Sequence, residues 1–400
     1  MTKKVLVVSH MYPSDVNPQS GIFVHNQTKA LRDAGCEVRV VVPIPNFPLY
    51  KKWKSYSDLP SQTERDGIPV YYVPTRMFPG GFFFHRYGAF YIRSLKTILH
   101  QIKQEFPYEL LHCHTIFPDG YAGGQLKEAL GVPVISTIHG SDIMLYPKKN
   151  KKIFERTIEA LKGSDHLITV SDRLRDEVDQ MVPGLPVSTI YNGFDPNRFY
   201  PIDCEEARLR LGIPSEGKKM VFIGNLLPVK GVGYLLQAFH SLVQDNQHEG
   251  LDLYLVGAGP LQSSLEKEIE ELNLSNRVHL MGRRPYDEMP LWMNSADVIA
   301  LTSLSEGLPS ILLESMGCGR PMVATDVGGI KEVLQDGVTG RLARPKDAEH
   351  IAQCLHEMIT MDDMREELGK QAYVASRGFS LEQNANQLIE CYDKIKSLTY

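Results

Sequence analysis

Apolar and polar residues alternate along the first half of the chain in a series of strand and helix patterns. Short buried-strand patterns cover residues 5–9, 37–42, 110–114, 133–138 and 165–170. Helical patterns lie between them, over residues 23–34, 84–105, 119–130 and 152–162, with another from Asp172. Because helices follow the strands repeatedly, the series predicts a parallel sheet covered on both faces. Residues 43–67 interrupt it and predict a surface excursion.

A second series begins after Asn192 and Gly193. Its strand patterns cover residues 220–223, 251–256, 278–281, 298–301 and 322–324, each followed by a helical pattern. A chain of 400 residues is longer than one core normally serves. We therefore predict two Rossmann-like, doubly wound parallel-sheet domains, at residues 1–195 and 196–379. The amphipathic segment at residues 380–400 is expected to form a helix that packs back on the first domain.

Composition narrows the class of protein. Hydrophobic residues make up 42% of the chain and charged residues 23%, which are globular values. The apolar run near Met1 is too short for a signal peptide, and no run is long enough to span a bilayer. The six cysteines are scattered, which argues against a disulfide framework or a zinc site and favours the reducing cytoplasm.

Charge is divided unevenly between the two halves. Residues 1–200 contain 24 Lys and Arg against 19 Asp and Glu, and the remainder contains 19 against 29. Basic clusters at residues 51–54 and 148–152 flank an aromatic-rich segment at residues 77–87. That segment either leads into a buried helix or inserts into the headgroup region of a membrane. The first half is therefore the one suited to an anionic surface or acceptor.

One stretch after the strand pattern at residues 298–301 concentrates glutamates and glycines. Glu306 falls in the loop, and Glu314 is expected about two turns into the following helix, on the same side. Between them the backbone at a helix start favours an anion, and this cradle comprises Gly307, Leu308, Pro309 and Ser310. Two carboxylates around a phosphate cradle suit a nucleotide sugar. The alternative is one exposed and one helix-surface glutamate, since such spacing is common by chance.

Other loops at strand ends carry related chemistry. Lys230 precedes a helix and can offset diphosphate charge, or can simply be an exposed lysine. The Gly257-Ala258-Gly259 motif is half of a dinucleotide fingerprint, but Gln262 replaces its third glycine, which argues against nicotinamide or flavin. No two aspartates stand two residues apart, so the D-x-D signature of a divalent cation on a nucleotide sugar is missing. We therefore expect no metal and no cofactor.

The loops of the first half contribute further candidates. His139 lies just past a strand and is suited to face the cleft expected between the two domains, although a lone histidine there is usually structural. Gly21 either permits close approach to a ligand or makes a turn. Asp119 and Asp142 are additional loop carboxylates, and helix capping explains Asp119 as well as catalysis does.

Taken together, these motifs resemble glycosyltransferase family 4. The resemblance runs in order through most of the chain and rests on Glu306-Gly307-Leu308-Pro309 through Glu314, Val229-Lys230-Gly231, Gly257-Ala258-Gly259-Pro260-Leu261, His139-Gly140-Ser141-Asp142, Asn192-Gly193-Phe194-Asp195 and Gly328-Gly329-Ile330-Lys331-Glu332. It implies the GT-B architecture, in which two Rossmann-like domains face an interdomain cleft, and anomer-retaining transfer from a nucleotide-diphosphate sugar. The chain looks closest to bacterial enzymes of cell-surface polysaccharide synthesis, of the teichuronic-acid type.

The resemblance also implies roles for individual residues. Glu306 would contact the donor sugar, Glu314 the ribose, Lys230 the diphosphate, His139 the sugar near the reacting carbon, and Gly21 the phosphates. The family usually carries arginine where this chain has Asn225, so one expected diphosphate cation is missing. We hypothesise that Arg283, Arg284 or Arg320 replaces it.

The expected partners follow from the same resemblance. They are a nucleotide sugar, with UDP as the expected nucleotide, and a glycan or polyprenyl-linked acceptor bound by the first domain. An anionic membrane surface is a further expected partner, on the inner face of the membrane, and nucleic acid is not. The alternatives are a nucleotide-sugar 2-epimerase of the same architecture, a dinucleotide-dependent oxidoreductase, and a noncatalytic sugar-binding protein.

Overall fold

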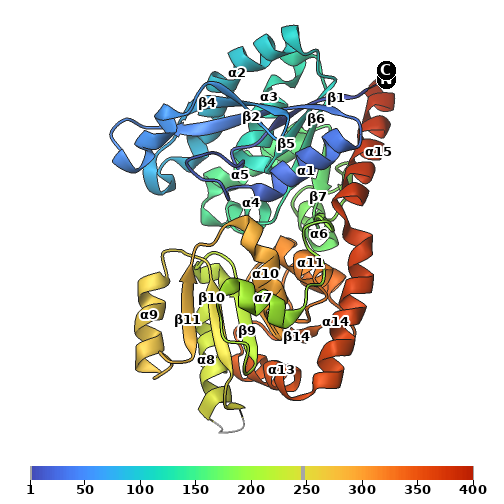
Figure 1. Ribbon diagram of the computed structural model, residues 1–400. Helices are drawn as coiled ribbons and strands as arrows, with labels where there is room; N and C mark the ends of the chain where they lie inside the picture. Colours follow the sequence, from blue (N-terminus) through green and yellow to red (C-terminus); the bar gives the residue numbers. More distant parts are fainter. Residues whose placement is uncertain (1, 245–247, 400) are drawn as a thin grey trace. The chain divides into compact units, whose positions relative to one another are not determined.

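A computed structural model describes residues 2–244 and 248–399 of the chain. The chain divides into two compact units, Met1–Gly193 with Leu381–Tyr400, and Phe194–Ser380 (Figure 1). Each unit is built around its own mostly parallel sheet, which confirms the predicted pair of doubly wound α/β domains. Within the described ranges, no helix combines the length and the apolar character that crossing a membrane requires.

The sheet of the first unit has eight strands in the order β3-β4-β2-β1-β5-β6-β7-β8. The strands are β1 (Lys4–Val8), β2 (Glu37–Asn46), β3 (Gln62–Arg65), β4 (Ile68–Arg76), β5 (Leu110–His114), β6 (Val134–Ile138), β7 (His166–Thr169) and β8 (Val187–Thr189). Every neighbouring pair is parallel except β3 and β4. The strand order reverses between β1 and β5, so the loops after these two strands lie side by side.

Helices cover both faces of this sheet. They are α1 (Ile22–Asp33), α2 (Tyr87–Glu105), α3 (Tyr121–Leu130), α4 (Ser141–Met144), α5 (Lys151–Gly163), α6 (Asp172–Met181) and α15 (Leu381–Thr399). The C-terminal helix α15 packs beside α1, where Leu388 and Tyr392 join the core formed by β1, β2 and α1 (Figure 1). The Tyr392 hydroxyl lies 2.7 Å from Nδ1 of His112 on β5, so the last helix is tied to the centre of the first sheet.

The region predicted as a surface excursion is more ordered than the sequence indicated. Strand β2 continues to Asn46, a 3-10 helix spans Lys51–Asp58, and β3 pairs with β4 as an antiparallel hairpin. Prolines at positions 69 and 74 hide β4 from a simple alternation pattern. The added hairpin extends one edge of the sheet.

The sheet of the second unit has six parallel strands in the order β11-β10-β9-β12-β13-β14. They are β9 (Lys219–Ile223), β10 (Asp252–Val256), β11 (Val278–Gly282), β12 (Val298–Leu301), β13 (Met322–Thr325) and β14 (Arg341–Ala343). The helices are α7 (Cys204–Leu211), α8 (Val232–Gln244), α9 (Gln262–Glu271), α10 (Met289–Asn294), α11 (Ser310–Gly317), α12 (Ile330–Val333), α13 (Ala348–Thr360) and α14 (Asp362–Ser376). Here the strand order reverses between β9 and β12, which brings their following loops together.

Candidate functional site

Lys230 and Glu306 form an ion pair at the carboxyl ends of β9 and β12. Nζ of Lys230 lies 2.6 Å from Oε1 of Glu306, and the Ser303 hydroxyl donates to the same oxygen at 2.6 Å. The Lys230 and Glu306 side chains are 21% and 11% exposed. In open α/β sheets this reversal of strand order is the usual ligand site. The structure thus unites two predicted residues that stand 76 positions apart.

Backbone contacts hold these two loops in place. Leu304 N–H donates to the Val229 carbonyl at 2.7 Å, and the Thr302 hydroxyl donates to the Gly231 carbonyl at 3.2 Å. On the other side, Gly328 has φ 59°, and a Cβ there would lie 1.9 Å from the Glu306 carbonyl oxygen. Only glycine fits that approach without moving the Glu306 loop.

The cradle between β12 and α11 is a tight turn. Pro309 is the N-cap of α11 in extended conformation, and no side chain caps the helix. Gly307 accepts a hydrogen bond from Gly329 N–H at 2.8 Å, so the turn is fixed from behind. The first-turn amides of an α-helix have no intrahelical acceptor, so the turn through Gly307, Leu308, Pro309 and Ser310 opens onto a helix start suited to an anion.

Glu314 lies in a different environment from Glu306. The helix begins at Ser310, so Glu314 lies about one turn into it. The sequence pattern places it about two turns in, which is wrong. Its side chain is buried and accepts a hydrogen bond from the Tyr286 hydroxyl at 2.9 Å. Burial raises the pKa of Glu314 to about 7, against the opposing effects of the Tyr286 hydrogen bond and the Arg198 charge. Glu314 is therefore a partly protonated acid near neutral pH.

Tyr286 is a site residue that the sequence analysis did not identify. It follows β11 in a short 3-10 turn, and Arg198 lies over its ring at 5.0 Å from the centroid. Arg198 also pairs with Asp287. No local motif marks Tyr286, because its partner Glu314 is 28 positions away.

Asn225 stands where the family usually has arginine, and the arginines considered as replacements lie in separate places. Asn225 is exposed in the loop after β9, next to Lys230 in the same loop. Arg283 follows β11, at the edge of the sheet and two strands from β9. The Arg284 guanidinium donates to the Met281 carbonyl at 3.1 Å and lies over Trp292.

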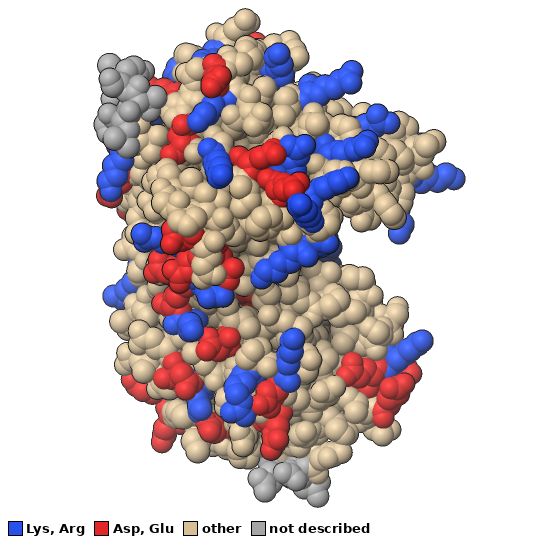
Figure 2. Space-filling view, turned by 180° about the vertical axis from the view of Figure 1, so that it is seen from behind, with Lys and Arg blue, Asp and Glu red and all other residues tan. Residues whose placement is uncertain are grey.

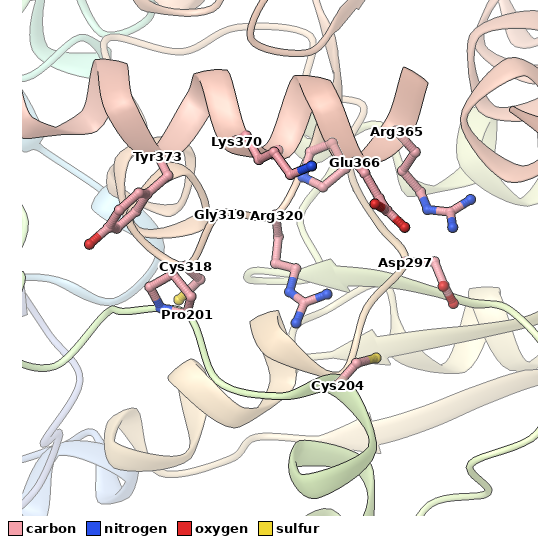
Figure 3. A pocket seen from close by; sticks show the side chains of 12 residues that line it. Pro201, Cys204, Asp297, Cys318, Gly319, Arg320, Arg365, Glu366, Lys370 and Tyr373 are labelled. Atoms are coloured by element: carbon pink, nitrogen blue, oxygen red, sulfur yellow. The ribbon is translucent and has the colours of Figure 1, made fainter. Parts of the chain in front are cut away.

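The hypothesis that Arg320 replaces the missing cation is wrong. Arg320 directly precedes β13, so it lies at the amino-terminal ends of the strands, whereas Glu306 follows a carboxyl end. Its Nη2 donates to the Ile202 carbonyl at 2.9 Å. Figure 3 shows it reaching into a separate pocket of about 430 Å³ beside Glu366 and Lys370 of α14.

In the first unit, His139 follows β6 and packs among aromatic rings. Its ring stacks on His114 at 5.3 Å between centroids, with Nε2 lying 3.1 Å from Nδ1 of His114, and contacts Phe23 at 4.8 Å. Burial, aided by the nearby His112 and His10, lowers the pKa of His139 to about 3. It is therefore neutral at pH 7 and can donate or accept one hydrogen bond without carrying charge.

Gly21 and Asp142 both shape loops in this unit. Gly21 has φ 60°, and a Cβ there would lie 2.1 Å from the Met11 carbonyl oxygen, so the turn before α1 requires glycine. Asp142 is buried and accepts hydrogen bonds from the backbone amides of Ile116 at 3.1 Å and Gly140 at 2.9 Å. Asp142 therefore holds two loops together through their backbone amides.

His10 and Asp119 form a second close pair. Nδ1 of His10 lies 2.5 Å from Oδ2 of Asp119, to which the Thr115 hydroxyl also donates at 2.8 Å. Their loops follow β1 and β5, where the strand order of this sheet reverses. His10 was not identified from the sequence, and helix capping does not account for Asp119, which is fully buried.

The two doubly wound units, with a lysine–carboxylate site where the strand order of the second sheet reverses, define a glycosyltransferase of the GT-B class. Two family models match, "Glycosyltransferase Family 4" over residues 20–198 and "Glycosyl transferases group 1" over residues 203–375. The chain therefore belongs to the glycosyltransferases that these two models describe, family 4 in its first half and group 1 in its second. The resemblance drawn from the motifs is confirmed, and the matches give no support to the epimerase alternative.

Relatives and solved structures agree with this assignment. The chain is 29% identical over 378 residues, 91% of its length and 92% of the relative's, to TuaC of Bacillus subtilis, described as a teichuronic acid biosynthesis glycosyltransferase. A sucrose-phosphate synthase from Thermosynechococcus elongatus superposes with TM-score 0.85 at 20% identity, covering 99% of this chain and 100% of that one. Alr3699/HepE of Anabaena, in complex with UDP-glucose, superposes with TM-score 0.75 at 21% identity, covering 98% and 99%.

Proposed function

We propose that this glycosyltransferase moves a sugar, with retention of the anomeric configuration, from a UDP-sugar to an acceptor in bacterial cell-surface polysaccharide synthesis. The observation that carries the proposal is the Lys230–Glu306 pair beside the uncapped start of α11. A cation, a carboxylate and helix-start amides together match a diphosphate linked to a hydroxyl-rich sugar. HepE, a structural neighbour, is described in complex with UDP-glucose. TuaC is described as a glycosyltransferase of teichuronic acid biosynthesis.

Each residue takes a separate part in this proposal. Lys230 exchanges its Glu306 partner for the diphosphate and offsets the charge of the leaving group, together with the backbone N–H groups of Gly307, Leu308 and Ser310. Glu306 accepts hydrogen bonds from donor-sugar hydroxyls, and Glu314 from the ribose. Asn225 adds a neutral donor, and Arg283 a cation at the edge of the sheet.

The proposed chemistry needs no protein nucleophile. The acceptor hydroxyl attacks the anomeric carbon on the face from which the diphosphate leaves. The departing phosphate helps to take the acceptor proton, while Lys230 stabilises the charge that develops. The first unit binds the acceptor, and we keep for His139 and Gly21 the roles implied by the family resemblance, hydrogen bonding to the sugar and close approach to the phosphates.

We also propose that the enzyme works peripherally on the inner, anionic face of the membrane. Phe82 and Phe83 are 72% and 51% exposed, and Leu49 is 86% exposed. Lysines at positions 51, 52 and 54 lie nearby in sequence, and Figure 2 shows Lys and Arg gathered on the edge of the first unit that carries this region. Exposed aromatic side chains flanked by cations suit the interface of an acidic bilayer.

The test of the proposed reaction is product stereochemistry. The enzyme is incubated with a UDP-sugar and a glycan acceptor, and the new linkage is read by proton NMR. We expect the anomeric configuration of the donor to be retained and UDP to be released in equal amount. An inverted linkage would overturn the mechanism, and epimerised donor without transfer would overturn the assignment.

A further inference from the structure

A cavity of about 500 Å³ opens in the first unit beside His10. Its walls are largely aromatic and include Trp53, Phe78, Phe84, Tyr87 and Tyr146. The aromatic-rich segment at residues 77–87 supplies Phe78, Phe84 and Tyr87. Phe84 is fixed by edge contacts with Tyr87 at 5.1 Å and Tyr146 at 5.3 Å between centroids. A cavity of this size, with flat apolar walls and few polar groups, has the character of a small-molecule site.

The polar group on one side of this cavity is His10, which Asp119 holds in place. The 2.5 Å contact to Asp119 occupies Nδ1 and sets the direction of the ring, which leaves Nε2 as the nitrogen available to a ligand. Burial lowers the pKa of His10, but the charge and the hydrogen bond of Asp119 outweigh it, so the net pKa is raised. His10 is a preorganised hydrogen-bonding group where the strand order of the first sheet reverses, the usual ligand position.

The cavity is also lined by a basic residue. Lys149 lines the cavity, with its Nζ 4.8 Å from the centroid of the Tyr146 ring. Near the cavity but not lining it, Lys152 and Arg86 lower the pKa of His85, after burial itself, and Arg156, which pairs with Glu159, adds a smaller part. Two acids of the neighbouring helix α5 are paired with bases of the same helix, Glu155 with Lys151 and Glu159 with Arg156, so Lys149 and Lys152 are the cations on which the rim of the cavity depends. The rim therefore attracts an anion.

We infer that this cavity binds the acceptor, and that the acceptor is a sugar carrying a negatively charged group. This inference rests on the proposed function and adds the class of acceptor. The sugar ring lies against the aromatic walls, a hydroxyl hydrogen-bonds to Nε2 of His10, and a phosphate or carboxylate lies at Lys149. A lipid-linked sugar supplies a phosphate and an acidic glycan supplies a carboxylate, so the two sources share this chemistry.

Trp53 allows the inference to be tested by binding alone. The chain has two tryptophans, and Trp292 is buried in the second unit, so a fluorescence change on titration is assigned to the cavity if Trp53→Phe abolishes it. The probes are glucose 1-phosphate, methyl glucuronide and methyl glucoside. We expect at least one anionic probe to bind at least tenfold more tightly than the neutral glucoside, and the stronger anion identifies the source of the charge.

Variants then assign the contacts. Lys149→Gln should bring the Kd of the preferred anionic probe to that of the neutral one. Lys162→Gln, the same change at the far exposed end of α5, should leave both unchanged. His10→Gln should weaken all three probes at least fivefold, while UDP binding to the second unit is retained.

Binding without discrimination between anionic and neutral probes would overturn the inference, as would anion preference that survives Lys149→Gln. Neither result touches the proposed function, because UDP binding and UDP release from a donor are measured separately. Conversely, if the wild-type protein binds the anionic probes selectively but transfers no sugar, the proposed function is contradicted and the inference about the cavity is not.

Discussion

The Lys230 ammonium group and the Glu306 carboxylate lie 2.6 Å apart, on loops that follow neighbouring strands β9 and β12. Removing either partner leaves the other charge mostly buried without its ion-pair partner, although Ser303 still donates a hydrogen bond to Glu306. If the proposed function is correct, the pair therefore links stability to donor binding in the second unit.

Replacing the two partners should separate their contributions to catalysis. We expect Glu306→Ala to lower kcat by about 100-fold or more, because the donor sugar loses its hydrogen-bond acceptor. Lys230→Ala should raise the donor KM about tenfold and also lower kcat, because both the ground-state diphosphate and the leaving group lose a cation. Steady-state kinetics of UDP release measures both, with Lys267→Ala on the exposed side of α9 as control. Unchanged turnover in both variants would refute the assignment of this pair.

Gly328 tests whether the backbone behind Glu306 matters for the site. We expect Gly328→Ala to lower turnover about tenfold, because the new Cβ must push the Glu306 carbonyl from 1.9 Å to ordinary contact. Gly337→Ala is the matched control, since Gly337 has φ 71° with nothing within 4 Å of its added Cβ. In both variants an alanine in the left-handed backbone region destabilises the folded state by about 1 kcal/mol, which lowers the Tm. Equal activity losses in the two variants would show that strain alone is responsible.

Glu314 makes stability depend on pH. Its pKa rises on folding from 4.5 to about 7, so the folded state binds the proton more tightly than the unfolded state. Its contribution is fully present below pH 4.5 and is lost as pH rises through 7, by about 3 kcal/mol in total. Urea unfolding of wild type and Glu314→Gln between pH 4 and 8 should give a free-energy difference that changes over this window. A difference independent of pH would contradict the buried environment of Glu314.

Two further variants sharpen that measurement. Tyr286→Phe removes the hydrogen bond that favours the carboxylate, so the midpoint of the stability change should move to higher pH. Glu270→Gln, on the exposed side of α9, should reproduce the wild-type profile. A midpoint that stays in place in Tyr286→Phe would mean that the Tyr286 hydrogen bond does not contribute to the pKa of Glu314.

Metal removal tests how the leaving diphosphate is stabilised. The sequence has no D-x-D signature, and within residues 2–244 and 248–399 no group of three acidic, histidine or cysteine residues is arranged to hold a metal ion. We expect dialysis against EDTA to leave the rate of transfer unchanged. A loss of activity restored by Mg²⁺ or Mn²⁺ would show that a cation besides Lys230 carries the charge.

Local sequence patterns predicted the parallel sheets and the ends of their strands well. Lys230, Glu306 and His139 are each within eight residues of a predicted strand, so their position at the carboxyl edge followed from the pattern alone. Strand β4 was missed because its prolines break the alternation, and β14 because three residues carry little periodicity.

Contacts between distant segments could not be predicted in this way. His10 and Asp119 are 109 positions apart, and nothing near either residue in the sequence indicates the other. Arg320 was misplaced because its closeness to Glu306 in the sequence was taken for closeness in space. The whole of helix α11 separates the two residues. The strand order fixes such relationships, and it appears only in the folded sheet.

A thermal-shift panel tests most directly whether the second unit binds a nucleotide-diphosphate sugar through Lys230. Wild type and Lys230→Ala are each titrated with UDP-, GDP-, ADP- and TDP-sugars, because a ligand that binds the folded state raises Tm by mass action. We expect a UDP-sugar to raise the wild-type Tm more than the other donors do, and Lys230→Ala to lose most of that rise. No shift with any nucleotide sugar, or an equal shift in both proteins, would contradict it.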